Sequence, residues 1–258
     1  MAVIIAIANQ KGGVGKTTTS VNLAASLAVA EQKTLLIDMD PQGNACSGVG
    51  IDVNNPEYTV YDLLMNKDLS VDSAIVHTQV PQLDIIPSNS DLIGAEIELV
   101  AEKGRESKLK HKLAQLHNEY TYIIVDCPPS LGLLTVNALV AADGVIVPLQ
   151  CEYYAMEGLS RLTQTINLIK KQLNVGLRLD GIVLTMFDRR NNLSHQVSDE
   201  VREHFKEQVF KTVIPRNVRL SESPSYGLPV LMYDIGSSGA KAYFELAREL
   251  MQRSKTDG

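Results

Sequence analysis

Two lysines frame a glycine-rich segment near the start of the chain. The segment reads Lys11-Gly12-Gly13-Val14-Gly15-Lys16-Thr17-Thr18. Glycines let backbone N–H groups approach an anion closely, and a helix that begins after them adds a partial positive charge at its first turn. In such a loop Lys16 would contact the β- and γ-phosphates of a nucleotide, and the Thr17 hydroxyl would be a ligand of Mg²⁺. The segment therefore predicts a phosphate site that takes a nucleotide together with Mg²⁺.

The order of residues departs from the ordinary phosphate loop, G-x-x-x-x-G-K-[ST]. Counting back from Gly15, the first glycine would fall at Gln10, and a second lysine, Lys11, begins the loop instead. Because Lys16 already serves the phosphates bound by its own subunit, Lys11 is free to point outward, toward a nucleotide held by a second copy. A cation supplied in this way can act as an arginine finger, which raises rates about 10³- to 10⁵-fold in other nucleotide hydrolases. The alternative is that the glycines form only a tight turn and that both lysines are solvated.

Three aspartates follow apolar runs that are typical of strands. Asp38 and Asp40 follow residues 34–37, and Asp126 follows residues 122–125. Ligands of open parallel sheets bind at the carboxyl ends of strands, and alternation places Asp38 and Asp40 on the same side of the extended segment. One of these two would serve the Mg²⁺ shell or the lysines, and the other could orient the attacking water. Asp126 suits water-mediated Mg²⁺ binding, as in a Walker B strand, although an aspartate there can also cap the next turn or helix.

Short apolar runs alternate with helical patterns along the chain. The first apolar run, residues 3–8, precedes the loop, and the first helical pattern, residues 17–30, follows it. This alternation predicts an α/β fold: a doubly wound, mostly parallel sheet with helices on both faces. No long linker divides the chain, so we expect one domain over residues 1–253 and a short disordered tail over 254–258. The remaining expected strands are 34–37, 83–86, 122–125, 144–147 and 181–184, and the remaining expected helices are 90–103, 106–118, 133–142, 154–172 and 193–205.

The composition excludes several classes of protein. The 258 residues suffice for a sizeable core, and 45% hydrophobic and 21% charged residues are ordinary for a globular protein. The net charge of −6 gives no overall electrostatic reason to bind nucleic acid, so such binding would need a local basic patch. The three cysteines lack C-x-x-C spacing and predict neither a disulfide framework nor a metal site. Since we find neither a signal peptide nor a membrane-spanning run, we expect a cytoplasmic protein.

The motifs resemble those of the ParA/Soj family of chromosome- and plasmid-partitioning ATPases, which carry the deviant Walker A loop of the MinD/ParA superfamily. The resemblance extends from residue 2 to about residue 250. It is closest to the short, Soj-like members, because no extra N-terminal DNA-binding domain precedes the loop. The matching segments are 9–18, 38–44, 126–129, 150–158 and 214–222.

The resemblance implies a role for each site residue, with ATP and Mg²⁺ as cofactors. Lys11 matches the signature lysine that contacts the partner's nucleotide, and Asp40 matches the aspartate needed for hydrolysis. Together with Lys16 they are the expected catalytic residues. Asp126 matches the Walker B aspartate, which binds Mg²⁺ through water, and Asp38 is a further candidate for the outer shell. The expected nucleotide-binding residues are Lys11, Gly12, Gly13, Val14, Gly15, Lys16, Thr17, Thr18, Met186, Pro215 and Asn217, with Pro215 and Asn217 in the loop that holds the adenine.

The resemblance also implies an ATP-dependent homodimer that binds double-stranded DNA without sequence preference and is associated with the nucleoid. Hydrolysis is expected to be slow unless DNA and a ParB-type partner stimulate it. Non-specific DNA binding requires neutralisation of phosphates, and basic residues are denser in the second half of the chain. The expected DNA contacts are Arg189, Arg190, Arg219 and Lys241, although any one of them could be a solvated or paired surface charge.

Three alternatives remain open. A MinD-like spatial regulator binds membranes through a C-terminal amphipathic helix, and residues 240–251 carry an apolar stripe at helical spacing. Such a stripe is more often a helix packed on its own sheet, and residues 253–258 lack the bulky apolar side chains of an interfacial anchor, so we expect no membrane partner. A nitrogenase-type iron protein would need cysteines that bridge a cluster, and Cys127 lacks the glycines expected around it. The third alternative is a nucleotide-gated DNA-binding regulator with negligible turnover.

Overall fold

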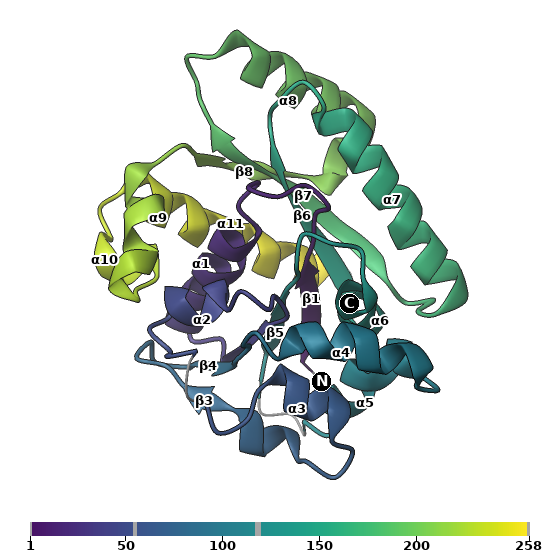
Figure 1. Cartoon of the computed structure of the whole chain (residues 1–258). Helices are drawn as coiled ribbons and strands as arrows, with labels where there is room; N and C mark the ends of the chain where they lie inside the picture. Colours follow the sequence, from purple (N-terminus) through teal and green to yellow (C-terminus); the bar gives the residue numbers. More distant parts are fainter. Residues whose placement is uncertain (1, 54–55, 117–119, 257–258) are drawn as a thin grey trace.

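The computed structural model describes residues 2–53, 56–116 and 120–256 (Figure 1). In this part of the chain eight strands form one sheet. The strands are β1 (Val3–Ile7), β2 (Thr34–Asp38), β3 (Val76–His77), β4 (Leu83–Ile86), β5 (Tyr122–Asp126), β6 (Gly144–Gln150), β7 (Arg178–Phe187) and β8 (Val209–Pro215). Their order in the sheet is β3-β4-β2-β5-β1-β6-β7-β8. Neighbouring strands are parallel except β3 and β4, which confirms the mostly parallel sheet expected from the sequence.

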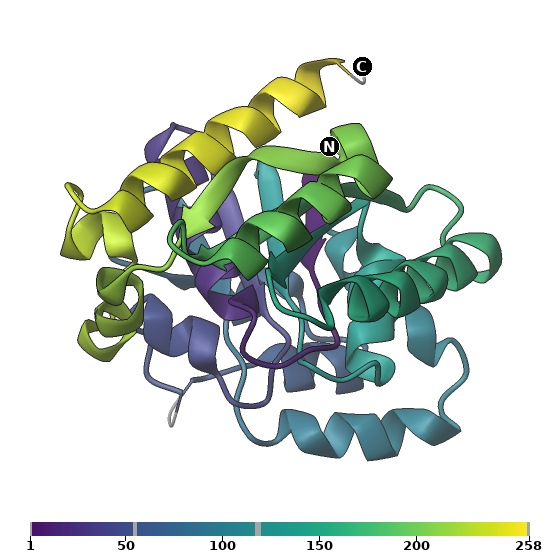
Figure 2. The same ribbon diagram turned by 90° about the horizontal axis from the view of Figure 1, so that it is seen from above.

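Helices cover both faces of this sheet, as Figure 2 shows from above, with α11 in yellow on one side and α4 in blue-teal on the other. The helices are α1 (Lys16–Val29), α2 (Asn44–Gly48), α3 (Val60–Met65), α4 (Leu92–Glu98), α5 (Lys108–Leu113), α6 (Leu133–Ala141), α7 (Ala155–Gln172), α8 (Asn192–Phe205), α9 (Val218–Glu222), α10 (Val230–Tyr233) and α11 (Ser238–Thr256). Helices α1, α2, α10 and α11 share one core, and helices from α3 to α8 share the other.

Alternation along the central strands divides the apolar residues between these two cores. In β2 the side chains of Leu35 and Ile37 join the core under α3 to α8, whereas Leu36 joins the core under α1 and α11. In β1, Ala6 joins the core under α3 to α8, and Ile7 joins the core under α1 and α11. A strand buried on both faces reads as a continuous apolar run, which is why the sequence located these strands well.

Helix α11 packs against α1 and β8, and its apolar stripe belongs to the core. Ala240, Tyr243 and Leu250 of this stripe are at most 2% exposed, as expected of a helix packed on its own sheet. The helix continues to Thr256, so the first residues of the tail that we expected to be disordered are helical, and the Ser254 hydroxyl donates to the Leu250 carbonyl at 3.1 Å. Residues 257 and 258 lie outside the described residues. Within the described chain no helix combines the length and the hydrophobicity needed to cross a membrane.

The bounds predicted from the sequence were wrong for some elements. The helix expected over 90–103 is α4 followed by a 3₁₀ turn, and the helix expected over 106–118 is a 3₁₀ turn followed by α5; residues 117 and 118 lie outside the described residues. Gly104, with a left-handed φ of 69°, separates the two segments. Strand β8 was not predicted, because it is an edge strand whose apolar residues are interrupted by the exposed Lys211.

Edge strand β8 is anchored by a carboxylate from α11. Glu249 accepts hydrogen bonds from the backbone N–H groups of Lys211 at 2.8 Å and Thr212 at 2.9 Å, and Arg253 pairs with it at 2.8 Å. Burial alone opposes the ionised form of Glu249, but these donors outweigh it and hold the pKa of the carboxyl below its usual value. The contact fixes the strand that leads to Pro215.

Replacing Glu249 by alanine should therefore lower the free energy of unfolding by about 1–3 kcal/mol near neutral pH, because two backbone donors lose their acceptor. The folded-state pKa lies below the ordinary value of about 4.3. The stabilisation is thus complete above that pH and is lost as the pH falls through the folded-state pKa. Urea denaturation at several pH values measures the difference. Glu245→Ala, which removes an exposed carboxylate from the same helix, is the control, and an equal effect of both variants would contradict the anchoring role.

Candidate functional site

The glycine-rich loop leads from β1 into α1 with its backbone exposed to a ligand. Gly13 and Gly15 have φ values of 73° and 85°, in the left-handed region that favours glycine. A Cβ added to Gly12 or Gly13 would meet no heavy atom within 4 Å, so the space beside them is open. Gly15 caps α1 without a side-chain hydrogen bond. The first N–H groups of the helix are therefore available to an anion.

Lys16 is the first residue of α1, and its side chain points back toward the start of the loop. Its side chain is almost buried, and Nζ donates to the Lys11 carbonyl oxygen at 3.1 Å. Burial lowers the pKa of Lys16, whereas the nearby carboxylates of Asp126 and Asp40 act in the opposite direction. Within the described residues Lys16 forms no ion pair. Its ammonium group is placed to receive an anion.

Asp126 presents a buried oxygen that lacks a hydrogen-bond donor. It ends β5 in register with Asp38 at the end of β2, and both residues are 0% exposed. Ser20 of α1 donates its hydroxyl to Asp126 Oδ1 at 2.7 Å, while Oδ2 has no partner within the described part of the chain. Burial, and then the charge of Asp38, raises the pKa of Asp126 to about 8. A carboxylate in this condition fits a site that a cation completes.

The donor set fits Mg²⁺ better than a metal enclosed by protein alone. Among the described residues no group of three or more His, Cys, Asp or Glu could hold a metal ion. Mg²⁺ commonly binds through one or two carboxylates together with phosphate oxygens and water. The residues that would hold it here are Thr17, in the first turn of α1, and Asp126.

Asp38 is held by local hydrogen bonds, and its place in the outer shell of a metal stays a prediction. Its Oδ1 accepts a hydrogen bond from Asp40 N at 3.0 Å, and its Oδ2 accepts from Ala45 N at 3.0 Å and from Cys46 N at 3.1 Å. Burial raises the pKa of Asp38 to about 6 even though these bonds favour the ionised form. Because both oxygens are already engaged, Asp38 anchors the start of α2 and the turn before it.

Asp40 lies in that turn, near the open end of the loop. It is 9% exposed, and its Oδ1 accepts a hydrogen bond from Gln42 N at 3.0 Å. No donor contacts Oδ2 among the residues that the structure describes. Gly43 closes the turn with a φ of 62°, and an added Cβ there would lie 2.7 Å from Val53 Cγ1. The tight turn therefore holds Asp40 with one oxygen available.

Lys11 is half exposed and is paired with a carboxylate of its own chain, and its contact with the nucleotide of a second copy stays a prediction. Its Nζ forms an ion pair with Glu152, in the loop after β6, and each side chain is 45% exposed. Lys11 N donates to Asn9 Oδ1 at 3.0 Å, and Asn9 Nδ2 donates to the Pro148 carbonyl at 2.7 Å. The loop is thus tied to β6 at two points, and Lys11 is held at its rim.

Met186 is the next-to-last residue of β7, and Pro215 ends the neighbouring strand β8. Met186 has a φ of 49°, which is uncommon for a side chain of its size. Its Cε lies 3.6 Å from the position of a Cβ on Gly15, and the adjacent Thr185 donates its hydroxyl to the Val14 carbonyl at 2.8 Å. The structure therefore brings Met186 to the loop, where an apolar contact with a base is available.

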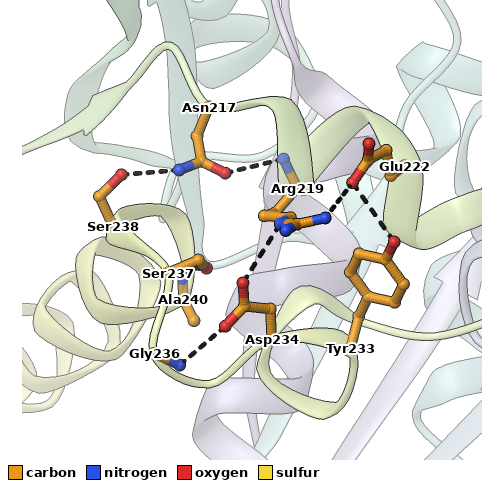
Figure 3. Close-up of polar contacts among 9 residues, drawn as sticks. All are labelled: Asn217, Arg219, Glu222, Tyr233, Asp234, Gly236, Ser237, Ser238 and Ala240. Carbon is orange, nitrogen blue, oxygen red and sulfur yellow. Dashed lines mark hydrogen bonds and ion pairs between the residues drawn. The ribbon is translucent and has the colours of Figure 1, made fainter.

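Asn217 is engaged in local hydrogen bonds, which Figure 3 shows. Its Oδ1 accepts from Arg219 N at 2.9 Å, and its Nδ2 donates to Ser238 Oγ at 2.7 Å. The side chain thus caps α9 and joins it to the start of α11. A contact of Asn217 with adenine stays a prediction.

Two of the four expected DNA-contacting residues are neutralised by carboxylates. Arg219 pairs with Glu222 at 2.8 Å and with Asp234 at 3.3 Å (Figure 3). Arg190 pairs with Asp188 at 3.2 Å. These arginines are less suited to phosphate contacts than the sequence had suggested, because each already has an anionic partner.

Arg189 and Lys241 differ from that pair. Neither forms an ion pair among the described residues, and both are exposed. They come from the turn after β7 and from the first turn of α11, and they line one cavity of ≈ 500 Å³ together with Phe187, Pro215 and Ser238. Two cations from distant parts of the sequence therefore converge at the edge of the sheet.

Sequence reasoning missed Ser20 and Glu152. Ser20 stands one turn after Lys16, so its position on the face of α1 toward β5 was a usable signal. Glu152 falls within residues 150–158, which carried the family resemblance. Nothing in the sequence, however, indicated that it meets Lys11 from 141 residues away.

Several known proteins are similar to this chain over most of its length. A family model described as AAA domain matches residues 2–179. The chromosome partitioning protein ParA of Myxococcus xanthus is 59% identical over 250 residues, covering 97% of this chain and 88% of that protein. The sporulation initiation inhibitor protein Soj of Bacillus subtilis is 56% identical over 250 residues, covering 97% and 98%. A solved structure of cobyrinic acid a,c-diamide synthase from Mycobacterium smegmatis with bound ADP and magnesium has a TM-score of 0.87 at 37% identity, covering 100% of this chain and 97% of that one.

These similarities extend over nearly the whole chain and include its deviant phosphate loop. The sheet order and the helices on both faces are those of a P-loop nucleotide hydrolase fold. The chain therefore belongs to the ParA/Soj family of chromosome partitioning proteins, within the MinD/ParA superfamily.

Proposed function

We propose that the protein is an ATPase that closes into a dimer around two ATP molecules, binds DNA without sequence preference in that state, and drives partitioning of a chromosome or plasmid. The observation that carries the proposal is the pair of lysines in one loop. Lys16 is buried beside the open phosphate site, whereas Lys11 is half exposed at the rim of the same loop. A ParB-type partner would accelerate an otherwise slow hydrolysis and release the protein from the nucleoid.

In each protomer, different residues would bind the phosphates, hold the metal and orient the water at the nucleotide of that protomer. Lys16 and the first N–H groups of α1 would neutralise the phosphates. Thr17 and Asp126 would hold Mg²⁺, which when bound spreads the negative charge of the phosphates. Asp40, with one oxygen available, would orient the attacking water. The ADP and magnesium in the solved relative support a site for a nucleotide and Mg²⁺.

Lys11 would act on the nucleotide of the second protomer. In the single chain it is neutralised by Glu152. A triphosphate that a partner brings to the rim of the loop carries more negative charge than one carboxylate and competes for the ammonium group. Exchange of Glu152 for phosphate would thus make dimerisation depend on ATP.

Lys11→Ala should keep its affinity for ATP but lose the ATP-dependent dimer, because the side chain contacts no part of its own phosphate site. Calorimetry measures the affinity, and light scattering during size-exclusion chromatography with a non-hydrolysable ATP analogue measures the mass. Lys16→Ala is the matched control and should lose ATP binding itself, by about tenfold or more. A normal dimer of Lys11→Ala would refute the role in trans.

Asp126→Asn should fold normally but lose the contribution of Mg²⁺ to ATP affinity. The amide can still accept the Ser20 hydrogen bond, whereas it no longer offers a charged acceptor to the water ligands of the metal. Titration of ATP with Mg²⁺ and with EDTA measures the contribution, and the thermal midpoint of the free protein checks the fold. If Mg²⁺ strengthened ATP binding equally in both proteins, Asp126 would not belong to the metal site.

Arg189→Ala should weaken binding to a random-sequence duplex in the ATP state and reduce the slope of log affinity against log salt by about one. The reason is that Arg189 has no carboxylate partner among the described residues. Arg219→Ala is the control and should change the slope less, since Glu222 and Asp234 already neutralise it. Fluorescence anisotropy across a salt series measures both slopes. An unchanged slope for Arg189→Ala would remove this residue from the DNA surface.

A further inference from the structure

Two arginines stand in the turn between β7 and α8, residues 188–191, which we call the arginine turn. Arg189 is exposed and forms no ion pair among the residues that the structure describes, whereas Arg190 pairs with Asp188 at 3.2 Å. A long side chain on a loose turn loses much conformational freedom when it binds a phosphate, and this loss weakens binding. The affinity of Arg189 for an anion therefore depends on how firmly its backbone is held.

Hydrogen bonds within the arginine turn fix part of its backbone. Asp188 Oδ1 accepts from Arg190 N at 3.0 Å, and the Asp188 carbonyl accepts from Asn191 N at 3.1 Å. The Asn191 side chain accepts from Leu193 N at 3.0 Å and so caps α8. These bonds restrain both ends of the turn, and none of them involves the carbonyl of Arg189.

The imidazole of His195, near the start of α8, holds the middle of the arginine turn. Its Nε2 lies 2.9 Å from the Arg189 carbonyl oxygen, and because a carbonyl can only accept, this nitrogen carries the proton and donates. The same ring meets Phe187 edge to face, with centroids 5.2 Å apart and an angle of 87° between the planes. One side chain thus contacts the residues on both sides of Asp188.

The strand that leads into the arginine turn is itself attached to the phosphate loop. Thr185 of β7 is 2% exposed, and its hydroxyl donates to the Val14 carbonyl at 2.8 Å. Two residues further along the same strand, Phe187 meets the His195 ring. The end of β7 is therefore a fixed support, and His195 joins Arg189 to it.

The geometry suits an indirect role of His195 better than a direct contact with DNA. Nε2 is already engaged by the Arg189 carbonyl, so the ring offers only Nδ1 to another group. The side chain of Arg189, by contrast, lines the cavity of ≈ 500 Å³ that Phe187 and Lys241 also line. The cation and the ring that supports its backbone thus belong to the same edge of the sheet.

We propose that His195 is a positioning residue for DNA binding, which holds the backbone of Arg189 so that its guanidinium group meets a phosphate with less loss of conformational entropy. The inference rests on the proposed DNA binding and adds to it a residue that contacts no DNA itself. His195 acts through two contacts at once, the hydrogen bond to Arg189 and the ring contact with Phe187, and the hydrogen bond carries most of the effect.

His195→Ala tests the proposal. Affinity for a random-sequence duplex, with a non-hydrolysable ATP analogue and Mg²⁺, should fall about threefold to tenfold, as for the loss of one hydrogen bond. The slope of log affinity against log salt should stay at the wild-type value, because no phosphate contact disappears. Fluorescence anisotropy across a salt series measures both quantities. His204→Ala is the matched control and should bind as the wild type does, since His204 is also an exposed histidine of α8 whose ring meets a phenylalanine, at 4.9 Å.

Two further variants separate the hydrogen bond from the ring contact. His195→Gln keeps an N–H donor near the position of Nε2 and should restore most of the affinity. His195→Phe keeps a ring against Phe187 without the donor and should bind DNA as weakly as His195→Ala. Wild-type affinity of His195→Phe would show that the bond to Arg189 does not position the turn, and the proposal would fall.

A double-mutant cycle with Arg189→Ala shows whether His195 acts through the arginine. The double variant should bind DNA no more weakly than Arg189→Ala alone, because the side chain that His195 positions is already missing. Additive losses would contradict the proposal, since His195 would then act independently of Arg189.

The outcomes separate this inference from the proposed function. A wild-type protein that binds no DNA with the analogue would overturn both. Normal DNA binding that His195→Ala leaves unchanged would overturn only the role of His195. A salt slope that His195→Ala lowers by about one would make His195 a direct phosphate contact and would also overturn its positioning role.

Hydrogen exchange of the free protein gives a second readout that needs no DNA. Backbone amides of the arginine turn should exchange severalfold faster in His195→Ala than in the wild type, because the turn loses its outside contact. The same amides should be unchanged in His204→Ala. Equal exchange in His195→Ala and the wild type would show that the imidazole does not restrain the turn.

Discussion

Two buried carboxylates, Asp38 and Asp126, lie in register at the carboxyl ends of β2 and β5, and the site is arranged around their negative charge. Hydrogen bonds satisfy Asp38, but one oxygen of Asp126 has no donor in the described chain. Burying a charge without a partner is costly unless a cation or a proton compensates for it. The adjacent Lys16 supplies part of that compensation, and Mg²⁺ with ATP would supply the rest. The free site therefore keeps one buried carboxylate oxygen without a donor, and a bound cation would satisfy it.

The sheet makes this arrangement possible because parallel strands bring their carboxyl ends to one edge. The strand before the phosphate loop, β1, lies between β5 and β6, so the loop stands next to Asp126 on one side and to Glu152 on the other. Helix α1 is also fixed by a contact with α10, since the Asn22 side chain accepts a hydrogen bond from Val230 N at 2.7 Å. The phosphate-binding helix is therefore fixed between the sheet and the C-terminal helices.

The sequence predicted the central strands and the acids at their ends, because continuous apolar runs and carboxylates at strand ends are local signals. It did not predict β8, whose backbone is hydrogen-bonded to Glu249 of a distant helix. It also could not separate Arg189 from Arg219, since the difference lies in carboxylates that only the tertiary structure brings near. Motif spacing thus predicts a nucleotide site, whereas the pairing of the surface charges could be seen only in the folded chain.

The hydrogen bond from Lys16 Nζ to the Lys11 carbonyl, 3.1 Å long, joins the two lysines whose proposed tasks lie in different protomers. A nucleotide that recruits Lys16 would weaken this bond to the carbonyl and so affect the backbone that carries Lys11. In the proposed dimer, occupancy of the nucleotide site and affinity between subunits would then be thermodynamically linked. By reciprocity, association of the subunits would raise the affinity for nucleotide by the same factor by which nucleotide favours association.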